Sequence, residues 1–529
     1  MPTAVGAPGR GRSGPAPATL APPPARFHPH GRGHPGAMQL PDPLSLWVDT
    51  APAPERAARP LPTEVDVVVI GAGIAGLTTA YALANAGRSV LVAEAGQVAG
   101  GVSGHTTAKV TAQHALKYAS LKSRKGLAGA QQYARSQLDA IDWIERTAAE
   151  LNLDCDFERR DSFVYSTKDK QVGKLKEEAD AAQEAGLPAS FVSDVELPIT
   201  VAGAVRVANQ AQFHPRKWLL GLAAAIEGLG GTIIEQARVQ RVDERPVPTV
   251  HVRGDQVRAQ DVVIATHYPI LDRGLYFARL EPTRDLVVTG EGDAPDGMYL
   301  DADTHHSVRG YDGLLIVGGE HYRTGEHVDV EERYQRLSEV AATFGVKKVT
   351  HRWSAHDMST LDGVPYVGRY HLGTRHLWVA TGFGQWGMTG GTAAGLLLDK
   401  EIRGEGSPYA GLYDPNRFDL RSGLKLAENN GQVTKHLVGD HVRATVGSGE
   451  LPSVGEGKVV RRGTQFVATY RADDGNVRSV NARCTHLGCL VAFNNAEKTW
   501  DCPCHGSRFG TDGSVIQGPA TRDLPPVAD

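Results

Sequence analysis

The chain has 529 residues, of which 41% are hydrophobic and 22% are charged, and its formal net charge at pH 7 is −4. These values are typical of a globular protein of about two to four domains, and so small a net charge predicts no nucleic-acid partner. The longest apolar runs are shorter than the ~18 residues that a membrane-spanning helix needs. Five cysteines in so long a chain do not indicate a secreted disulfide scaffold, so we expect a cytoplasmic protein.

Residues 1–60 are rich in Pro, Gly, Ala and Arg and poor in large apolar side chains. Such a segment cannot bury enough apolar surface to order itself, and we predict a disordered N-terminal extension. It also lacks the apolar stretch of about 7–15 residues that a secretion signal contains. Both Met1 and Met38 are candidate starts of translation.

A dinucleotide-binding motif follows this segment. Residues 65–70, VDVVVI, are typical of a buried strand, and a helix-forming segment ends at Gly87. Between them, Gly71, Gly73 and Gly76 have the G-x-G-x-x-G spacing. In this motif the glycines allow a tight turn, close approach of a pyrophosphate and close packing of helix on strand, and the helix N-terminus holds the phosphates.

A second predicted strand, residues 89–94, ends in Glu94, which lies 18 residues after Gly76 and can accept from ribose hydroxyls. This context favours an adenine dinucleotide over a glycine-rich turn in an ordinary βαβ unit. Residues 96–114 are rich in Gly, Ser and Thr, whereas NAD-binding domains usually continue directly into another helix. The segment therefore favours FAD, and its expected FAD contacts are His105 and Thr106.

Four later motifs complete a resemblance to a known family. Residues 231–242, 261–267, 307–320 and 361–368 read GTIIEQARVQRV, DVVIATH, SVRGYDGLLIVGGE and LDGVPYVG. With the first motif they resemble, over about residues 64–418, the FAD-dependent oxidoreductases of the D-amino acid oxidase and glycine oxidase superfamily. The resemblance implies an α/β FAD-binding (Rossmann-like) domain, residues 61–420, with an inserted α+β substrate domain at about 115–200 and 270–350.

The resemblance also singles out two residues. Some related amine-oxidising flavoproteins have a histidine at the place of His105 that bonds the flavin covalently; the alternative is a polar side chain beside the diphosphate. Amino-acid-oxidising members grip the substrate carboxylate with an arginine near the place of Arg309, a role that suits the planar guanidinium. Arg309 is thus a candidate catalytic-site residue. One extra residue beside it shifts the register of the family pattern, and the alternative is an arginine paired with a surface acid.

A second G-x-G-x-x-G occurs at Gly382, Gly384 and Gly387. The alternatives are an NAD(P)H site and a second contact with the flavin. Residues 407–418 contain two prolines and no apolar strand, so the βαβ unit is not completed. The resemblance implies that this loop, with Met388, aims a helix N-terminus at the pyrimidine edge of the flavin, which favours its anionic reduced form.

Two cysteine–histidine boxes lie near the end of the chain, C-T-H-L-G-C and, twelve residues later, C-P-C-H-G-S. Zinc sites favour paired C-x-x-C knuckles, so zinc fits these boxes less well. The boxes resemble those of the Rieske domain. The resemblance implies that Cys484 and Cys502 bind one iron of a [2Fe–2S] cluster and that His486 and His505 bind the other.

The same resemblance implies a disulfide between Cys489 and Cys504, which joins the cluster loops in Rieske proteins of cytochrome complexes. Those proteins usually have a Tyr at the place of Phe509 that donates to a ligand sulfur, so we expect a lower potential here. Residues 447–529 then form a small all-β Rieske domain, and residues 421–446 are the linker to the flavin domain.

The combination predicts an oxidoreductase. We expect an amine or amino acid to be oxidised at FAD and electrons to leave singly through the cluster to a protein or quinone acceptor. The alternatives are electrons that enter through the cluster to a flavin that reduces or hydroxylates a substrate, and a non-catalytic redox sensor. A Rieske oxygenase needs two His and a carboxylate on a mononuclear iron, and neither His351 with His356 nor His305 with His306 has an acid at the family spacing.

Overall fold

The computed structural model describes residues 38–56, 59–271, 273–417 and 451–527. Most of the predicted N-terminal extension and the whole predicted linker at 421–446 lie outside the described residues. Residues Met38–Asp529 form one compact unit. Within the described ranges, no helix is long and apolar enough to cross a membrane.

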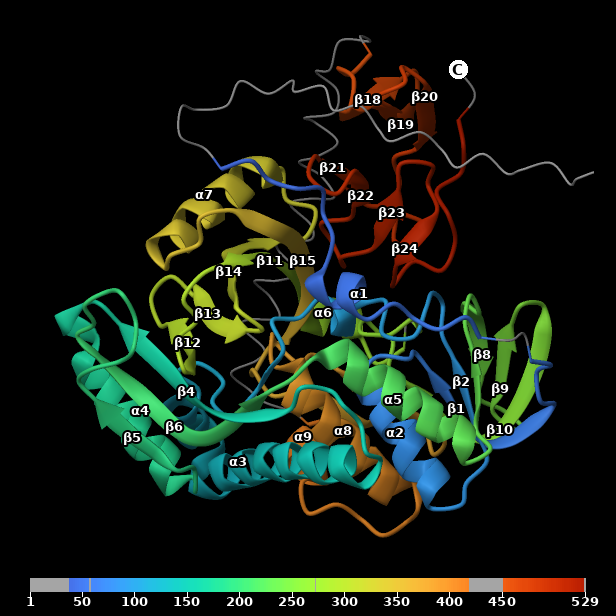
Figure 1. Cartoon of the computed structure of the whole chain (residues 1–529). Coiled ribbons are helices and arrows are strands. Elements are labelled where there is room, and N and C mark those ends of the chain that lie inside the picture. Colours follow the sequence, from blue (N-terminus) through green and yellow to red (C-terminus); the bar gives the residue numbers. More distant parts are fainter. Residues whose placement is uncertain (1–37, 57–58, 272, 418–450, 528–529) are drawn as a thin grey trace, which may run out of the picture. The chain divides into compact units, whose positions relative to one another are not determined.

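The first sheet has the strand order β16-β17-β10-β1-β2-β7. A hairpin of β8 and β9 lies beside β10 (Figure 1). Its strands are β1 (Glu64–Ile70), β2 (Val90–Ala93), β7 (Thr232–Ile234), β8 (Val239–Asp243), β9 (Thr249–Val252), β10 (Asp255–Ile264), β16 (Tyr366–Arg369) and β17 (Leu377–Thr381). The strands from β17 to β7 are parallel. Val68 and Val69 of β1 are both fully buried, as a parallel sheet that is covered on both faces requires.

Three helices pack on this sheet: α2 (Ile74–Asn85), α5 (Pro215–Gly228) and α8 (Gly387–Ile402). Helix α2 contacts both of the others. Helices α2 and α8 begin in the two G-x-G-x-x-G segments, so both glycine motifs place a helix N-terminus. Residues 403–417 contain only the short helix α9 (Ala410–Tyr413) and no strand, which is the incomplete βαβ unit predicted after α8.

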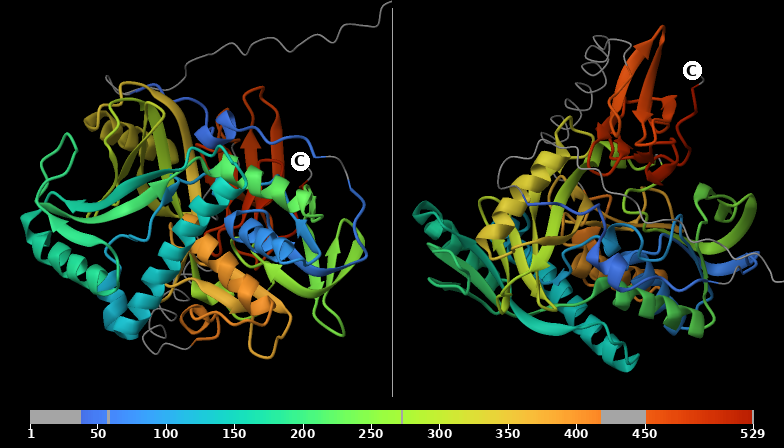
Figure 2. Two further views of the ribbon diagram at one scale, coloured as in Figure 1. Left: turned by 60° about the horizontal axis from the view of Figure 1, so that its bottom comes forward. Right: turned by 45° about the horizontal axis from the view of Figure 1, so that its top comes forward.

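The second sheet has the order β15-β11-β14-β13-β12-β4-β6-β3, with β5 beside β6. Its strands are β3 (Lys109–Val110), β4 (Glu158–Ser166), β5 (Ala189–Val192), β6 (Gly203–Gln212), β11 (Leu280–Glu291), β12 (Gly297–Asp301), β13 (Ser307–Tyr311), β14 (Leu314–Arg323) and β15 (Val349–Thr360). The described residues before the Rieske domain also contain the helices α3 (Tyr118–Glu150), α4 (Val172–Glu184), α6 (Tyr276–Arg279) and α7 (Val330–Thr343), and the 3-10 turns η1 (Val102–Gly104) and η2 (Asp169–Gln171). Helix α3 contacts α4 and α8, and so joins the two sheets (Figures 1 and 2).

Residues 38–56 differ from the disordered extension predicted over 1–60. They contain helix α1 (Leu46–Thr50), which the hydroxyl of Ser45 caps by accepting from the N–H of Trp47. The Trp47 indole is fully buried against His214, Tyr311 and Trp353. A composition average over the first 60 residues hides this short apolar segment.

The C-terminal part consists of two small antiparallel sheets, β18-β19-β20 and β21-β22-β23-β24. Their strands are β18 (Gly457–Arg462), β19 (Gln465–Arg471), β20 (Val477–Asn481), β21 (Ala492–Asn494), β22 (Thr499–Asp501), β23 (Arg508–Gly510) and β24 (Val515–Gln517). Phe466, Trp500 and Phe509 pack with the buried cysteines in their core. The predicted fold class, an α/β domain with an α+β part and a small all-β domain, is confirmed.

Candidate functional site

A cavity of about 1320 Å³ lies at the carboxyl ends of β1, β2 and β10. It exceeds the roughly 300–1,000 Å³ of ordinary small-molecule pockets, as an extended dinucleotide requires. Seven predicted FAD contacts line it: Gly71, Gly73, Glu94, His105, Thr106, Gly387 and Met388. Gly76, Gly382 and Gly384 are not among the lining residues.

The turn after β1 has room only for glycine at two positions. Gly71 has φ +106°, and a Cβ on it would lie 2.4 Å from the carbonyl oxygen of Ala265. A Cβ on Gly76 would lie 2.0 Å from the carbonyl oxygen of Gly71. Gly71 thus allows the turn and Gly76 allows the close packing of α2, so the N-terminus of α2 faces the cavity.

Glu94, the residue that follows β2, stabilises the same turn. Its carboxylate accepts hydrogen bonds from the N–H of Ala72 and of Gly96, both at 2.7 Å. Burial raises the pKa of Glu94, although these two hydrogen bonds act in the opposite direction. Glu94 also lines the cavity, where its role toward a ribose stays a prediction.

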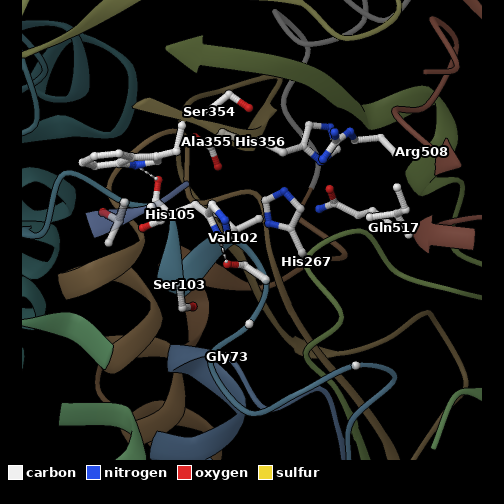
Figure 3. Close-up of a pocket in the computed structure, with 18 of the residues that line it drawn as sticks. Gly73, Val102, Ser103, His105, His267, Ser354, Ala355, His356, Arg508 and Gln517 are labelled. Atoms are coloured by element: carbon white, nitrogen blue, oxygen red, sulfur yellow. Dashed lines mark hydrogen bonds between the residues drawn. The ribbon is translucent and has the colours of Figure 1, made fainter. Parts of the chain in front are cut away.

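Two buried tryptophans hold the segment that contains His105 and Thr106. The indole N–H of Trp353 donates to the carbonyl oxygen of His105 at 3.0 Å, and that of Trp47 donates to the carbonyl oxygen of Thr106 at 2.7 Å. The imidazole Nδ1 of His105 lies 2.9 Å from the carbonyl oxygen of Gly101 (Figure 3). Sequence reasoning missed Trp47 because it lies in the Pro-rich N-terminal segment.

Arg309 lies behind this segment. It is fully buried, its Nε donates to the carbonyl oxygen of Thr107 at 2.5 Å, and its guanidinium carbon is 5.2 Å from the centre of the Trp47 ring. Burial lowers the pKa of Arg309 to about 9. Arg309 is not among the residues that line the cavity. Its predicted role toward a substrate carboxylate therefore stays a prediction that these contacts do not support.

Lys109 is a cationic residue inside the cavity that sequence reasoning missed. Its ammonium donates to the carbonyl oxygen of Tyr299 at 2.6 Å and to the hydroxyl of Ser307 at 2.7 Å. Burial, with a smaller contribution from the charge of Arg309, lowers the pKa of Lys109 to about 7. A lysine in the otherwise uncharged segment TTAKVTA was the available signal.

Asp357 of β15 is an acid on the wall of the same cavity. Its side chain is buried, and its Oδ2 has no hydrogen-bond partner in the described part of the chain. Burial raises the pKa of Asp357 to about 8, so the carboxyl group is mostly protonated at neutral pH. The cavity therefore holds an acid and a base whose charges both change near neutrality.

The two cysteine–histidine boxes meet in the C-terminal domain. A disulfide joins Cys489 to Cys504, as the sequence resemblance implied. Cys484 and Cys502 are buried free cysteines, and contact with the Cys502 thiol lowers the pKa of Cys484.

The imidazole rings of His486 and His505 lie 4.9 Å apart. Two converging thiols beside two neighbouring imidazoles form a donor set that fits a mixed thiolate–imidazole [2Fe–2S] cluster. These four residues would hold the cluster, and their ligand roles stay predictions.

The cluster loops pack on the rest of the chain through two glycines. A Cβ on Gly325 would lie 2.4 Å from the backbone nitrogen of Pro503, and a Cβ on Gly506 would lie 2.6 Å from Nε2 of His356. Both glycines have positive φ, +73° and +76° respectively. The loop that carries the second predicted ligand box is therefore in direct contact with the flavin part of the chain.

Polar contacts add to this interface. The side-chain oxygen of Asn495 accepts from the first N–H of α7, that of Val330, at 3.0 Å. The guanidinium of Arg238 donates to the carbonyl oxygen of Val515 at 2.9 Å. Arg284 of β11 pairs with Glu497 at 2.6 Å. Two hydrogen bonds and an ion pair thus connect the flavin part to the Rieske domain.

The histidines considered for a mononuclear iron do not form such a site. His351 lies 3.2 Å from Asp49, and His356 is buried beside the cluster loop. In the part of the chain that the structure describes, no two histidines and a carboxylate lie close enough to share a metal ion. The alternative of a Rieske oxygenase lacks its iron site there.

Comparison with known proteins identifies both parts. Residues 66–400 match the family described as FAD dependent oxidoreductase, and residues 443–528 match the Rieske [2Fe-2S] domain. A protein of Bacillus subtilis (strain 168) named as a Rieske 2Fe-2S iron-sulfur protein, YhfW, is 34% identical over 493 residues, which are 91% of this chain and 97% of that protein.

Two further similarities concern the flavin part. Gamma-glutamylputrescine oxidoreductase of Escherichia coli (strain K12) is 25% identical over 383 residues, covering 68% of this chain and 86% of that protein. Glycine oxidase from Geobacillus kaustophilus has a similar fold, with a TM-score of 0.60 and 19% identity over 68% of this chain and 100% of that one. The cofactors are FAD and a [2Fe–2S] cluster. The chain belongs to the FAD-dependent oxidoreductases, and its C-terminal domain is a Rieske [2Fe–2S] domain.

Proposed function

We propose that the protein oxidises a C–N bond of an amine or amino acid and passes the electrons one at a time through the Rieske domain to a protein or quinone acceptor. One observation carries this proposal: the cluster box packs directly on the wall of the FAD cavity, through Gly506 and His356. The names of the related γ-glutamylputrescine oxidoreductase and glycine oxidase support an amino compound as substrate.

Bound FAD supplies a two-electron acceptor, and the cluster supplies a one-electron carrier. The protein positions the site around them. Trp47 and Trp353 fix the carbonyl groups of residues 105 and 106, and the N-terminus of α8 at Gly387 directs its positive end into the cavity. The residues between the cavity and the cluster box exclude bulk water, because His356 and Tyr268 are buried there.

Lys109 gives the cavity a preference for an anionic group on the substrate. Its ammonium makes two hydrogen bonds to protein oxygens, so one of its three donors is left for a ligand. A substrate carboxylate at this position would raise the pKa of Lys109 again, since an opposite charge favours the protonated form. We therefore expect amino acids to be better substrates than simple amines.

An oxygen-free panel of amino acids and the amines that lack their carboxylate tests this proposal. We expect at least one amino acid to bleach the flavin absorbance with release of a carbonyl product. If no member bleaches the flavin, while a reduced ferredoxin reduces the cluster first and the flavin afterwards, electrons flow inward and the proposal is wrong.

A further inference from the structure

One layer of side chains separates the FAD cavity from the cluster loops. On the cavity side, His267 follows β10 and His356 belongs to β15, and both line the cavity. Their ring centres are 5.2 Å apart. Figure 3 shows the two imidazoles near each other, with Arg508 of the Rieske domain beside His356 and Gln517 of that domain beside His267.

The other side of this layer contacts both predicted histidine ligands. The ring of Tyr268, the residue after His267, lies 6.4 Å from the ring of His486 and 6.2 Å from that of His505, edge to face in both cases. His356 contacts the backbone at Gly506, which directly follows His505. Tyr268 and His356 are each only 2% exposed, so packed protein atoms fill the space.

We propose that His267, Tyr268 and His356 form the electron path between FAD and the cluster. This inference rests on the proposed function. Each transfer oxidises the flavin by one electron and reduces the cluster by one electron, and the external one-electron acceptor reoxidises the cluster before the second transfer. Contacting, packed atoms carry an electron between buried centres faster than a gap of the same length does.

Phe277 provides a matched control on the same side of the interface. Its ring lies 6.1 Å from the ring of His505, almost the same separation as for Tyr268. Neither Phe277 nor Tyr268 lines the cavity, but Tyr268 directly follows His267, which does. A residue that merely packs on a ligand and a residue that connects the ligand to the cavity can therefore be compared directly.

The experiment is flash photoreduction of the full-length holoprotein without oxygen, with photoreduced deazaflavin as the electron source. In the wild type we expect a phase of flavin reoxidation and cluster reduction whose rate does not depend on protein concentration. Tyr268→Ala and His356→Ala should slow this phase by about tenfold or more, whereas Phe277→Ala should change it by less than about twofold. Tyr268→Phe keeps the ring and should keep the rate.

Flavin content and the paramagnetic resonance spectrum of the dithionite-reduced cluster should stay unchanged in every variant, which separates the path from folding and assembly. A different result would be loss of the cluster from the alanine variants, with Tyr268→Phe as slow as Tyr268→Ala. That result would assign these residues to cluster assembly and overturn the proposed electron path. Equal rates in the wild type and both alanine variants, or equal slowing by Phe277→Ala, would also overturn it and leave the proposed function intact. A wild type without the concentration-independent phase would contradict the proposed function itself.

Discussion

Arg284 of β11 donates two hydrogen bonds to the carboxylate of Glu497, at 2.6 and 2.7 Å, and so ties the flavin part to the Rieske domain. Arg508 and Ser354 donate to the same carboxylate. Burial alone would raise the pKa of Glu497, but the charges of Arg284 and Arg508 outweigh burial and lower the pKa to about 2. Glu497 is therefore ionised at neutral pH inside the interface.

Glu497→Gln should destabilise the protein by about 3–5 kcal/mol, because it removes a largely buried carboxylate from two largely buried arginines and leaves Asp501 to balance both of them. The exposed pair of Lys122 and Glu184 is the control, and Glu184→Gln should cost only about 0–1 kcal/mol. Since the pKa of Glu497 is lowered from 4.5, its contribution is present above that pH and is lost as the pH falls toward 2. Denaturant unfolding at neutral pH measures both variants, and equal costs would contradict this account.

Asp357 should make stability fall as the pH rises. In the unfolded chain this carboxyl group ionises near pH 3.8, whereas in the folded protein burial raises the pKa of Asp357 to about 8. Between these two pKa values the folded state binds one proton more than the unfolded state does. The free energy of unfolding therefore falls as the pH rises through this range. Asp357→Asn should match the wild type near pH 4 and gain relative stability by pH 8. An unchanged difference across this range would exclude the buried, protonated carboxyl group.

Lys109→Met should weaken binding of a carboxylate-bearing substrate by about 1.5–3 kcal/mol, the range for a hydrogen bond to a charged group. The amine that lacks the carboxylate is the control and should bind equally to both proteins. In the wild type, KM for the amino acid should rise as the pH increases through about 7, because the ammonium of Lys109 loses its proton there. A KM that is flat across this pH range would remove Lys109 from the substrate site.

Arg309→Lys distinguishes the sequence-based expectation from the contacts in the structure. If Arg309 grips the substrate carboxylate, the variant should bind an amino acid about 1–3 kcal/mol more weakly with FAD content unchanged. Its contacts with Thr107 and Trp47 instead predict a loss of stability and equal substrate affinity. Thermal unfolding and KM, measured together, decide between these outcomes.

The disulfide between Cys489 and Cys504 should stabilise the cluster loops. The two residues are 15 apart in sequence, and a closed loop of that length contributes about 3 kcal/mol in the chain-entropy model. The double variant Cys489→Ser, Cys504→Ser should lose about this much stability and release iron to a chelator faster. Cys155→Ala is the control, since Cys155 is a buried free cysteine far from the boxes in sequence. Iron release at the same rate from all three proteins would contradict a stabilising role.

Metal analysis checks the four predicted ligands. Protein prepared without oxygen should contain about two irons per flavin and no stoichiometric zinc. His486→Cys should keep the fold, change the paramagnetic resonance spectrum and lower the reduction potential, because it adds a thiolate. An unchanged spectrum in this variant would remove His486 from the ligand set.

The sequence predicted the parts of the site that depend on local chemistry. The glycines at 71 and 76 and the acid at 94 lie within one strand–helix–strand unit, where spacing alone determines geometry. The two cysteine–histidine boxes are likewise short, and their disulfide could be expected from the family resemblance.

The rest of the site depends on contacts between distant residues. Arg284 and Glu497 are 213 positions apart, and no local pattern marks them as partners. Lys109 and Trp47 are single side chains whose roles follow from burial by other strands, which periodicity does not reveal. The register shift beside Arg309 was visible in the sequence, but its new partners, Thr107 and Trp47, were not.

The most direct test of the account is anaerobic addition of a substrate that bleaches the flavin, followed over time by optical absorbance and by paramagnetic resonance of frozen samples. The account predicts that flavin bleaching comes first and that the signal of a reduced Rieske cluster then grows as part of the flavin colour returns. A flavin that stays bleached beside a cluster that stays oxidised, although dithionite can reduce that cluster, would contradict it.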